Sequence, residues 1–258
     1  MGSLTFLGTG GSMGVPIIGC RCPVCLSKDE KNKRTRPSAF LKAKGKAIVI
    51  DAGPDFRTQA LREEISHIDG VIFTHAHHDH TAGLDDLRVF TIRRSNPIPC
   101  LLSEKTANDL KRRYDYIFRE GGESKLVSKV ELQILEEERG ETHFLDISFR
   151  YLSYIQSGML VNGFKVGNLA FITDIKNFSE TIYDDLQGTK VLVVSALRHG
   201  PSHMHLTVEE ALAFSRKVGA EQTWLTHIAH ELDHEQTNRS LPSNVQLAYD
   251  GLTISFQE

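Results

Sequence analysis

Four histidines and one aspartate lie within the six-residue stretch 75–80, which reads HAHHDH and directly follows the apolar run 70–74. Imidazole nitrogens and carboxylate oxygens are donors that zinc takes at about 2.0 to 2.2 Å. If the strand period of two persists past residue 74, His75 and His77 project the same way. Asp79 and His80 follow in the turn, where they can serve a neighbouring ion. The alternative, surface histidines without a ligand role, is disfavoured because this spacing directly after a buried strand is rare by chance.

Three cysteines, Cys20, Cys22 and Cys25, lie within six positions of one another. This spacing is too tight for ordinary structural disulfides and suits thiolate ligands in a reducing compartment. Three thiolates are one short of the closed tetrahedron of a structural zinc site, so a fourth ligand is needed. Three unrelated thiols, or a redox site, are the less favoured alternatives. Cys100 lies in the apolar run 98–102 and is expected to be a small buried hydrophobe.

The composition predicts a globular protein with nothing in its overall charge that indicates nucleic acid or an anionic membrane. The chain has 258 residues, 40% hydrophobic content and a net charge of −3, which suffices for a full core. No linker of low complexity divides it, so we expect a single domain spanning 1–258. No signal peptide opens the chain and no apolar run approaches the ~18 residues of a membrane helix. We therefore expect a cytoplasmic protein that does not bind membranes.

The apolar and alternating runs predict a fold in which strands and helices are layered. Helical periodicity appears at 55–65, 104–118 and 207–218, and Thr207 precedes Glu210 by the three residues of a capping box. Strands are predicted at 3–7, 46–52, 70–74, 98–102, 169–173, 190–196, 222–226 and 252–256. The class is therefore α/β, with polar loops at the strand ends carrying the chemistry.

These motifs together resemble the metallo-β-lactamase superfamily of dinuclear metallohydrolases. The likeness rests on HAHHDH at 75–80 with Asp51 in IVIDAG before it. Within the superfamily, four further stretches are similar to the cyclic-phosphodiesterase branch typified by the phosphonate-pathway enzyme. They are FLGTGGSMGVPIIGCRCPVC at 6–25, IDAGPDFRTQ at 50–59, GNLAFITD at 167–174 and LTHIAHELDH at 225–234. The resemblance implies an αββα sandwich, two mixed β-sheets packed face to face with helices on the outer faces.

The resemblance also implies a ligand set, in which Asp174 bridges two ions of Zn²⁺ or Mn²⁺. It points to His230 as the fourth ligand of one structural Zn²⁺ in a knuckle loop at 19–36, which would brace His227. Asp51 is expected to orient a ligand imidazole and fix its tautomer. One ion would be held by His75 and His77, and the other by Asp79, His80 and His227.

The sequence departs from the family at one ligand position. The family supplies a third histidine to the first metal about twenty residues before the bridging aspartate, and Gln156 stands there in this chain. An amide oxygen is a poorer zinc donor than imidazole, so the first site should bind more weakly or take manganese. His143 lies thirty-one residues before Asp174, which is too early for this role. A mononuclear enzyme, or a metal-binding protein with weakened or lost activity, is therefore an alternative.

His205 aligns with the family's proposed general acid, in a loop that enters the helix predicted at 207–218. Imidazole suits protonation of a departing alkoxide at neutral pH, whereas His199 and His203 are read as helix-entry histidines and His234 as local support. The implied reaction is hydrolysis of a phosphodiester by hydroxide that the metals generate from water. Asp79 and His205 are the expected catalytic residues.

A small-molecule phosphodiester, cyclic or otherwise, is the favoured partner. The alternative is an endonuclease like the tRNA 3′-processing enzymes, but no arm-like insertion for tRNA is visible. The loop 28–36 (KDEKNKRTR) is read as solvated, with contact to a nucleic-acid backbone as the less favoured interpretation, and 136–139 (EEER) is also expected to be solvated. By analogy with related dimers, the resemblance suggests a homodimer.

Overall fold

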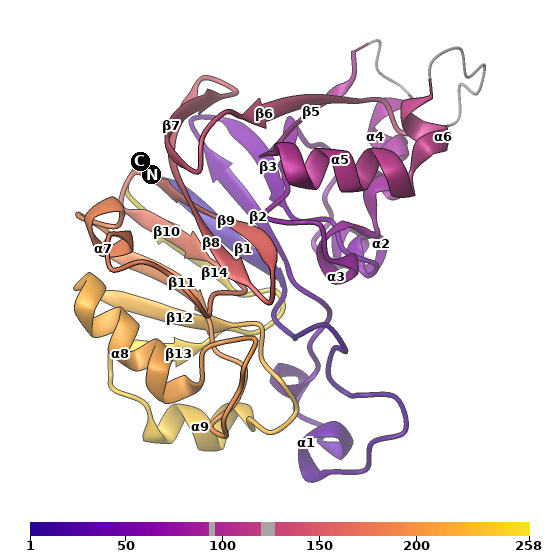
Figure 1. Ribbon diagram of the computed structural model, residues 1–258. Coiled ribbons are helices and arrows are strands. Elements are labelled where there is room, and N and C mark those ends of the chain that lie inside the picture. The colour runs from indigo at the N-terminus through magenta and orange to yellow at the C-terminus, as the bar shows by residue number, and fades with distance from the viewer. Residues whose placement is uncertain (93–95, 120–126) are drawn as a thin grey trace.

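Two seven-stranded β-sheets lie face to face in the computed structural model, which describes residues 1–92, 96–119 and 127–258 (Figure 1). The first sheet has the order β14 (Thr253–Phe256), β1 (Gly2–Gly8), β2 (Ser38–Ala43), β3 (Lys46–Ile50), β4 (Gly70–Ile72), β5 (Ile98–Ser103) and β6 (Val130–Leu135). The second sheet has the order β13 (Val245–Leu247), β12 (Gln222–Thr226), β11 (Val191–Ser195), β10 (Leu169–Ile172), β9 (Met159–Val166), β8 (Ile147–Gln156) and β7 (Arg139–Phe144). Both sheets are mixed, so the expected αββα architecture is confirmed.

Each sheet combines a parallel part with an antiparallel part. Strands β3 to β6 run parallel to one another, as do β10 to β13. The remaining neighbours pair antiparallel, including β1 with β14, which brings the chain termini together at one edge (Figure 1). Since parallel strands end at the same edge of a sheet, the loops that follow β3, β4, β10 and β12 can meet at one place.

The alternation of side chains along the strands builds three apolar layers. Ile48 and Ile50 of β3 point between the sheets, where they join Phe164 and Val193 of the second sheet in one core cluster. Val49, between them, points to the outer face and packs in the cluster beneath the first sheet's helices. Both faces of these strands are buried, which explains why they are nearly continuous apolar runs.

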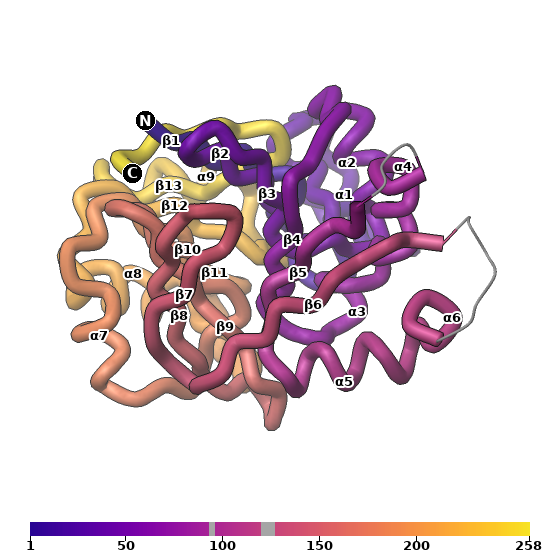
Figure 2. Tube along the Cα trace, turned by 90° about the horizontal axis from the view of Figure 1, so that it is seen from above, coloured from indigo at the N-terminus to yellow at the C-terminus, as the bar shows by residue number. Residues whose placement is uncertain are grey.

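Helices cover the outer face of each sheet (Figure 2). On the first sheet these are α2 (Phe56–Arg62), α4 (Arg88–Thr91), α5 (Glu104–Arg113) and α6 (Asp115–Phe118), and on the second α7 (Ile182–Asp185), α8 (Val208–Val218) and α9 (His234–Ser240). The short elements α1 (Pro23–Leu26), η1 (Glu30–Asn32), α3 (His78–Thr81) and η2 (Leu84–Leu87) lie in the loops. No helix in the described residues is both long and apolar enough to cross a membrane.

The predicted elements are found with shifts of a few residues at their ends. The capping box of Thr207 and Glu210 is present at the start of α8, whereas the helix predicted at 104–118 is interrupted at Tyr114. Strands β2, β6, β7, β8, β9 and β13 were not predicted. Several of these bury only every second side chain, as β7 and β8 do, and polar residues on their exposed faces hide the pattern. The stretch 136–139 is exposed, as expected, at the turn between β6 and β7.

The reading of 28–36 as a solvated loop is wrong for its buried members. The side chain of Arg34 is almost fully buried, with Nη1 donating to Thr9 Oγ1 and to the Ala248 carbonyl. Asn32 is also buried, and its amide accepts from the backbone of His234. Arg36 forms an ion pair with Asp55 at 2.6 Å. Thr9 and Asp55 follow strands of the first sheet and Ala248 follows β13 of the second, so these basic side chains tie the loop to both sheets.

Candidate metal centre

The expected site residues follow the carboxyl ends of strands in both sheets. Asp51 follows β3, His75 follows β4 and Asp174 follows β10, while His227 comes directly after β12. All four side chains are buried at the edge where the two sheets meet. The close approach of these loops requires glycine at position 53, because a Cβ there would lie 2.0 Å from the backbone oxygen of Asp79.

Donor atoms of four residues face one another at distances suited to a metal ion. His80 Nε2 lies 3.2 Å from Asp174 Oδ2 and 3.5 Å from Asp79 Oδ2. His227 Nε2 lies 3.3 Å from Asp174 Oδ1 and 3.6 Å from Asp79 Oδ2. Zinc bonds of 2.0 to 2.2 Å in a tetrahedron place donors about 3.4 Å apart. The spacing of these atoms therefore fits a divalent cation.

A second set of donors adjoins the first. His75 Nε2 and His77 Nδ1 lie 2.9 Å apart, so both imidazoles face the same space. His75 also belongs to a group with His80 and Asp174 whose donor atoms all lie within 4.8 Å of one another. Asp174 is common to both sets, which is the position expected of a bridging carboxylate. His78, the fourth histidine of the motif, is not among these groups.

Three of the site residues have left-handed backbones that non-glycine residues rarely adopt. The φ angles are 60° at Asp51, 53° at Asp174 and 58° at His227. Such conformations cost of order 1–3 kcal/mol each and persist only where the surrounding structure imposes them. Their occurrence at these three positions shows that the fold turns the chain abruptly to aim the side chains into the site.

Asp51 orients two of the imidazoles. Its Oδ2 accepts from His80 Nδ1 at 2.6 Å, which leaves His80 Nε2 facing the other donors. The same oxygen accepts from the hydroxyl of Thr74 at 2.7 Å, and that hydroxyl contacts His75 Nδ1 at 3.0 Å. Such outer partners fix the tautomer and orientation of ligand imidazoles. Thr74 was not predicted as a site residue, although it lies beside His75 in the motif.

The histidines and carboxylates of the site attract one another, but several buried ring nitrogens have no hydrogen bond among the described residues. Burial lowers the pKa of His75 well below its ordinary value. Burial opposes the charged forms of His80 and Asp174, yet attraction to Asp174 raises the pKa of His80, and attraction to His227 and His80 lowers that of Asp174. His80 Nε2 and both ring nitrogens of His227 have no hydrogen-bond partner among the described residues. Buried polar atoms without partners are costly, so this donor set fits a bound cation.

His205 lies against this centre and is held by Gln156. The ring of His205 stacks on that of His227 with centroids 4.4 Å apart, and its Nδ1 lies 3.5 Å from Asp174 Oδ1. Gln156, at the end of β8, places its amide nitrogen 3.3 Å from His205 Nε2. The amide oxygen of Gln156 is buried without a hydrogen-bond partner among the described residues. Burial, together with the nearby His227, lowers the pKa of His205 to about 4.

The other histidines of this loop are placed at its surface. His199 pairs with Glu209 at 2.7 Å, and both side chains are about half exposed. His203 lines a pocket beside the centre.

Two further histidines lie outside this loop. His143 is exposed on β7, away from the ligand groups. His234 contacts Arg34 at 3.1 Å, as expected of a supporting residue.

The three cysteines surround the imidazole of His230. Its Nδ1 lies 3.3 Å from the sulfur of Cys20 and 3.5 Å from those of Cys22 and Cys25. Zinc bonds of about 2.3 Å to sulfur and 2.0–2.1 Å to nitrogen would separate such atoms by about 3.5 Å. A backbone N–H from Cys25 lowers the pKa of the Cys22 thiol to about 7, whereas burial raises that of Cys25 to about 11. The geometry fits a closed structural zinc site. Cys100 is fully buried, as expected.

The cysteine cluster is tied to the centre through the segment 227–230. Ile228 pairs with Gly10 through a parallel bridge, and its backbone N–H donates to Thr9. The N–H of Ile17 donates to the sulfur of Cys25. His227 and His230 lie three residues apart, so the cluster anchors the loop that carries a ligand of the centre.

Comparisons with known proteins agree with this fold. A family profile described as "Beta-lactamase superfamily domain" matches residues 46–228. A solved structure described as a new diphosphatase from the PhnP family is 38% identical and superposes with a TM-score of 0.91, covering 100% of this chain and 98% of that one. The Zn²⁺-bound PqqB of Methylobacterium extorquens has a TM-score of 0.74 at 19% identity, covering 98% of this chain and 100% of that one, and shares the fold.

A curated relative is longer than this chain. The protein named octanoyltransferase in Porphyromonas gingivalis is 33% identical over 257 residues, which is 98% of this chain. The chain spans about half of that relative, 51% of its length.

Proposed function

Because this chain belongs to the metallo-β-lactamase superfamily and, within it, to the PhnP family, we propose that it is a metal-dependent phosphodiesterase acting on small or cyclic phosphates. The observation that carries the proposal is the meeting of four side chains, in which the Nε2 atoms of His80 and His227 each lie 3.2 to 3.6 Å from carboxylate oxygens of Asp79 and Asp174. Because Asp174 also belongs to the group with His75 and His80, these residues would hold a second ion next to the first.

The residues that would hold the ions are the predicted ones, and zinc is supported by the Zn²⁺-bound neighbour of the same fold. When bound, Zn²⁺ or Mn²⁺ lowers the pKa of water toward neutrality and draws negative charge from phosphoryl oxygens. One ion would lie among His75, His77 and Asp174, and the other among Asp79, His80, His227 and Asp174.

His205 is the proposed proton donor. Its Nδ1 is buried, has no hydrogen-bond partner among the described residues and faces the centre beside Asp174. Only the doubly protonated ring can give up its Nδ1 proton and end neutral, and its Nε2–H needs an acceptor, which the unpartnered amide oxygen of Gln156 supplies when the amide is turned about. A phosphate anion beside this ring would favour its protonated form. When the bond from phosphorus to the leaving oxygen breaks, the electron pair goes to that oxygen, which takes the proton from Nδ1.

The diphosphatase neighbour supports hydrolysis at phosphorus and adds a phosphoanhydride as a candidate for the bond that is cleaved. A reducing compartment such as the cytoplasm suits the three thiolates of the cysteine cluster.

Turnover of bis(4-nitrophenyl) phosphate by the zinc- or manganese-loaded protein tests the proposal. We expect turnover in at least one metal. His205→Ala should lose about 100-fold in kcat on a ribose cyclic phosphate, whose alkoxide needs a proton, and much less on the nitrophenyl ester, whose leaving group departs as an anion. Absence of turnover in every metal would leave a metal-binding protein without this activity. Faster hydrolysis of a nucleoside diphosphate than of any diester would place the activity at the anhydride bond instead.

A further inference from the structure

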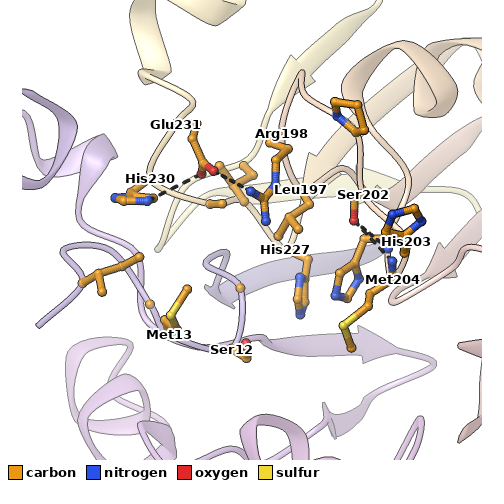
Figure 3. Close-up of a pocket in the computed structure, with 17 residues that line it drawn as sticks. Ser12, Met13, Leu197, Arg198, Ser202, His203, Met204, His227, His230 and Glu231 are labelled. Carbon is orange, nitrogen blue, oxygen red and sulfur yellow. Dashed lines mark hydrogen bonds and ion pairs between the residues drawn. The ribbon is translucent and has the colours of Figure 1, made fainter. Parts of the chain in front are cut away.

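A pocket of about 520 Å³ opens directly beside His205 and His227 (Figure 3). Its walls come from three loops, the glycine-rich segment 11–17, the segment 197–205 and the segment 227–231. In Figure 3, Arg198 and Glu231 lie at the top, His203 and Met204 at the right, and Met13 at the lower left. This volume falls within the range of sites that bury small organic ligands.

The walls of the pocket are largely apolar. Met13, Ile17, Leu197 and Met204 line it, and Met13 and Met204 are 62% and 45% exposed. Unbranched methionine side chains adapt to ligands of varied shape and contact aromatic rings favourably. Large apolar side chains left open to solvent around a cavity indicate a ligand with an apolar face.

One side of the pocket is polar. Arg198 Nη1 donates to Glu231 Oε1 at 2.9 Å, and both side chains are about 40% exposed. Nε of Arg198 has no hydrogen-bond partner among the described residues. Since a guanidinium offers five N–H donors, Arg198 retains donors for a ligand even while paired with Glu231. The pair also cancels the charge, so this wall favours a neutral acceptor over a further phosphate.

The position of His205 decides which half of a substrate would fill this pocket. His205 borders both the metal centre, through Asp174 at 3.5 Å, and the pocket that it lines. A proton donor must lie beside the oxygen that departs. The group attached to that oxygen is therefore directed from the centre, past His205, into the pocket.

We propose that this pocket is the leaving-group subsite, and that it takes an aromatic or nucleoside-sized alcohol with an apolar face and a neutral hydrogen-bond acceptor directed at Arg198. The inference rests on the proposed function for the direction of the substrate. The pocket wall that includes Ile17 and His230 is held by the cysteine cluster, so the subsite is built on a rigid base.

Kinetics with two substrates test which half the pocket holds. Bis(4-nitrophenyl) phosphate and methyl 4-nitrophenyl phosphate share the leaving group and differ only in the group that is retained. Met204→Trp fills the pocket, while Ile18→Trp adds the same ring at a fully exposed position of the N-terminal loop outside the pocket lining. We expect Met204→Trp to raise KM about tenfold for both substrates with kcat little changed, and Ile18→Trp to leave both constants unaltered.

Three results would overturn this subsite. A rise in KM confined to bis(4-nitrophenyl) phosphate would show that the pocket holds the retained group. Equal behaviour of Met204→Trp and Ile18→Trp would show that it holds neither. Equal binding of 4-nitrophenol to both variants, measured by ligand-observed NMR on the metal-loaded protein without any turnover, would also exclude it. This last measurement separates the subsite from the proposed function, because it decides the subsite even if neither diester is hydrolysed.

A substitution tests whether the guanidinium of Arg198 donates a hydrogen bond to the ligand. Arg198→Met should weaken binding of 4-nitrophenol, whose nitro oxygens accept hydrogen bonds, several-fold more than binding of 4-ethylphenol, which has no such acceptor. Equal weakening of the two phenols would remove Arg198 from the subsite.

Discussion

Asp51 acts on the centre through another residue, because its carboxylate holds His80 at 2.6 Å and Thr74 at 2.7 Å. Asp51→Asn keeps the shape and removes the charge that orients the imidazole. We expect metal affinity to fall about 10- to 100-fold, the usual effect of losing such a partner. Competition with a chelator measures this, with Asp184→Asn on the exposed surface of α7 as the matched control. Equal affinities in the two variants would contradict the orienting role.

Gln156 has two candidate roles, positioning of His205 and ligation of a metal ion, and the substitution Gln156→Leu distinguishes them. Its amide nitrogen contacts His205, while its oxygen is free of hydrogen bonds among the described residues. If it positions His205, Gln156→Leu lowers kcat about tenfold or more while the bound metal stays constant. If it is a weak ligand instead, Gln156→Leu lowers the metal content measured by mass spectrometry.

Gln156→His restores the donor that the family places at this position. We expect it to tighten binding at the first site, since imidazole is the better zinc ligand. Isothermal titration with Zn²⁺ measures the change. Unaltered binding would mean that the side chain at this position does not reach the ion.

The ligands of the centre were predictable where residue types that bind metals recur at a spacing typical of metal sites. The histidine motif and the cysteine spacing identify most of the ligands, and the resemblance brought Asp174, His227 and His230 to them. Thr74 and the contact between Gln156 and His205 were not predictable. Both depend on how β8 and the loop 197–206 approach the centre, and spacing along the chain carries no information about that approach.

At the scale of elements, the cysteine cluster anchors the loop between β12 and α9. Cys22→Ala should release one zinc ion per chain and lower the melting temperature, because a structural zinc site contributes folding energy directly. The matched control is Cys100→Ala, which truncates a buried cysteine outside the cluster. Loss of one zinc from both variants, or from neither, would refute the assignment of Cys20, Cys22, Cys25 and His230.

The buried Arg34 of the loop 28–36 lies beside His234, and this contact predicts a change in stability with pH. Burial, together with the charge of Arg34, lowers the pKa of His234 to about 4. A histidine held neutral in the fold contributes stability above its unfolded pKa near 6.5, and this stability is lost as the pH falls toward 4. His234→Gln should therefore lose less melting temperature between pH 7 and pH 5 than the parent protein. His143→Gln, at an exposed site, should behave like the parent, and the same pH response in all three would contradict this account.

Most strands with both faces buried were predictable, although β2 was missed, and the alternating strands β1 and β14 were also predicted. Strands such as β11 and β12 are apolar runs, whereas β6 to β9 alternate and carry charged residues such as Glu131 and Arg150 on their exposed faces. Arg34 was misjudged for a related reason. Its neighbours in the chain are charged and exposed, and its burial depends on Thr9 and Ala248, which are distant in sequence.

At the scale of the whole molecule, the charge distribution argues for a small substrate. The net charge is −3, and in the basic loop 28–36 Arg34 is bound to Thr9 and Arg36 to Asp55. RNA binding should therefore be weak, with a log–log slope against salt near zero. Titration of a labelled tRNA precursor from 50 to 200 mM salt measures it. A steep negative slope would favour the nuclease alternative.

Anomalous diffraction at the zinc edge from crystals grown with zinc tests the central claim most directly. The account predicts one peak enclosed by Asp79, His80, Asp174 and His227, and another enclosed by the three cysteine sulfurs and His230. A second peak beside His75 and His77 would report on the site next to Gln156. Absence of any peak between His80, Asp174 and His227 in zinc-saturated crystals would contradict it.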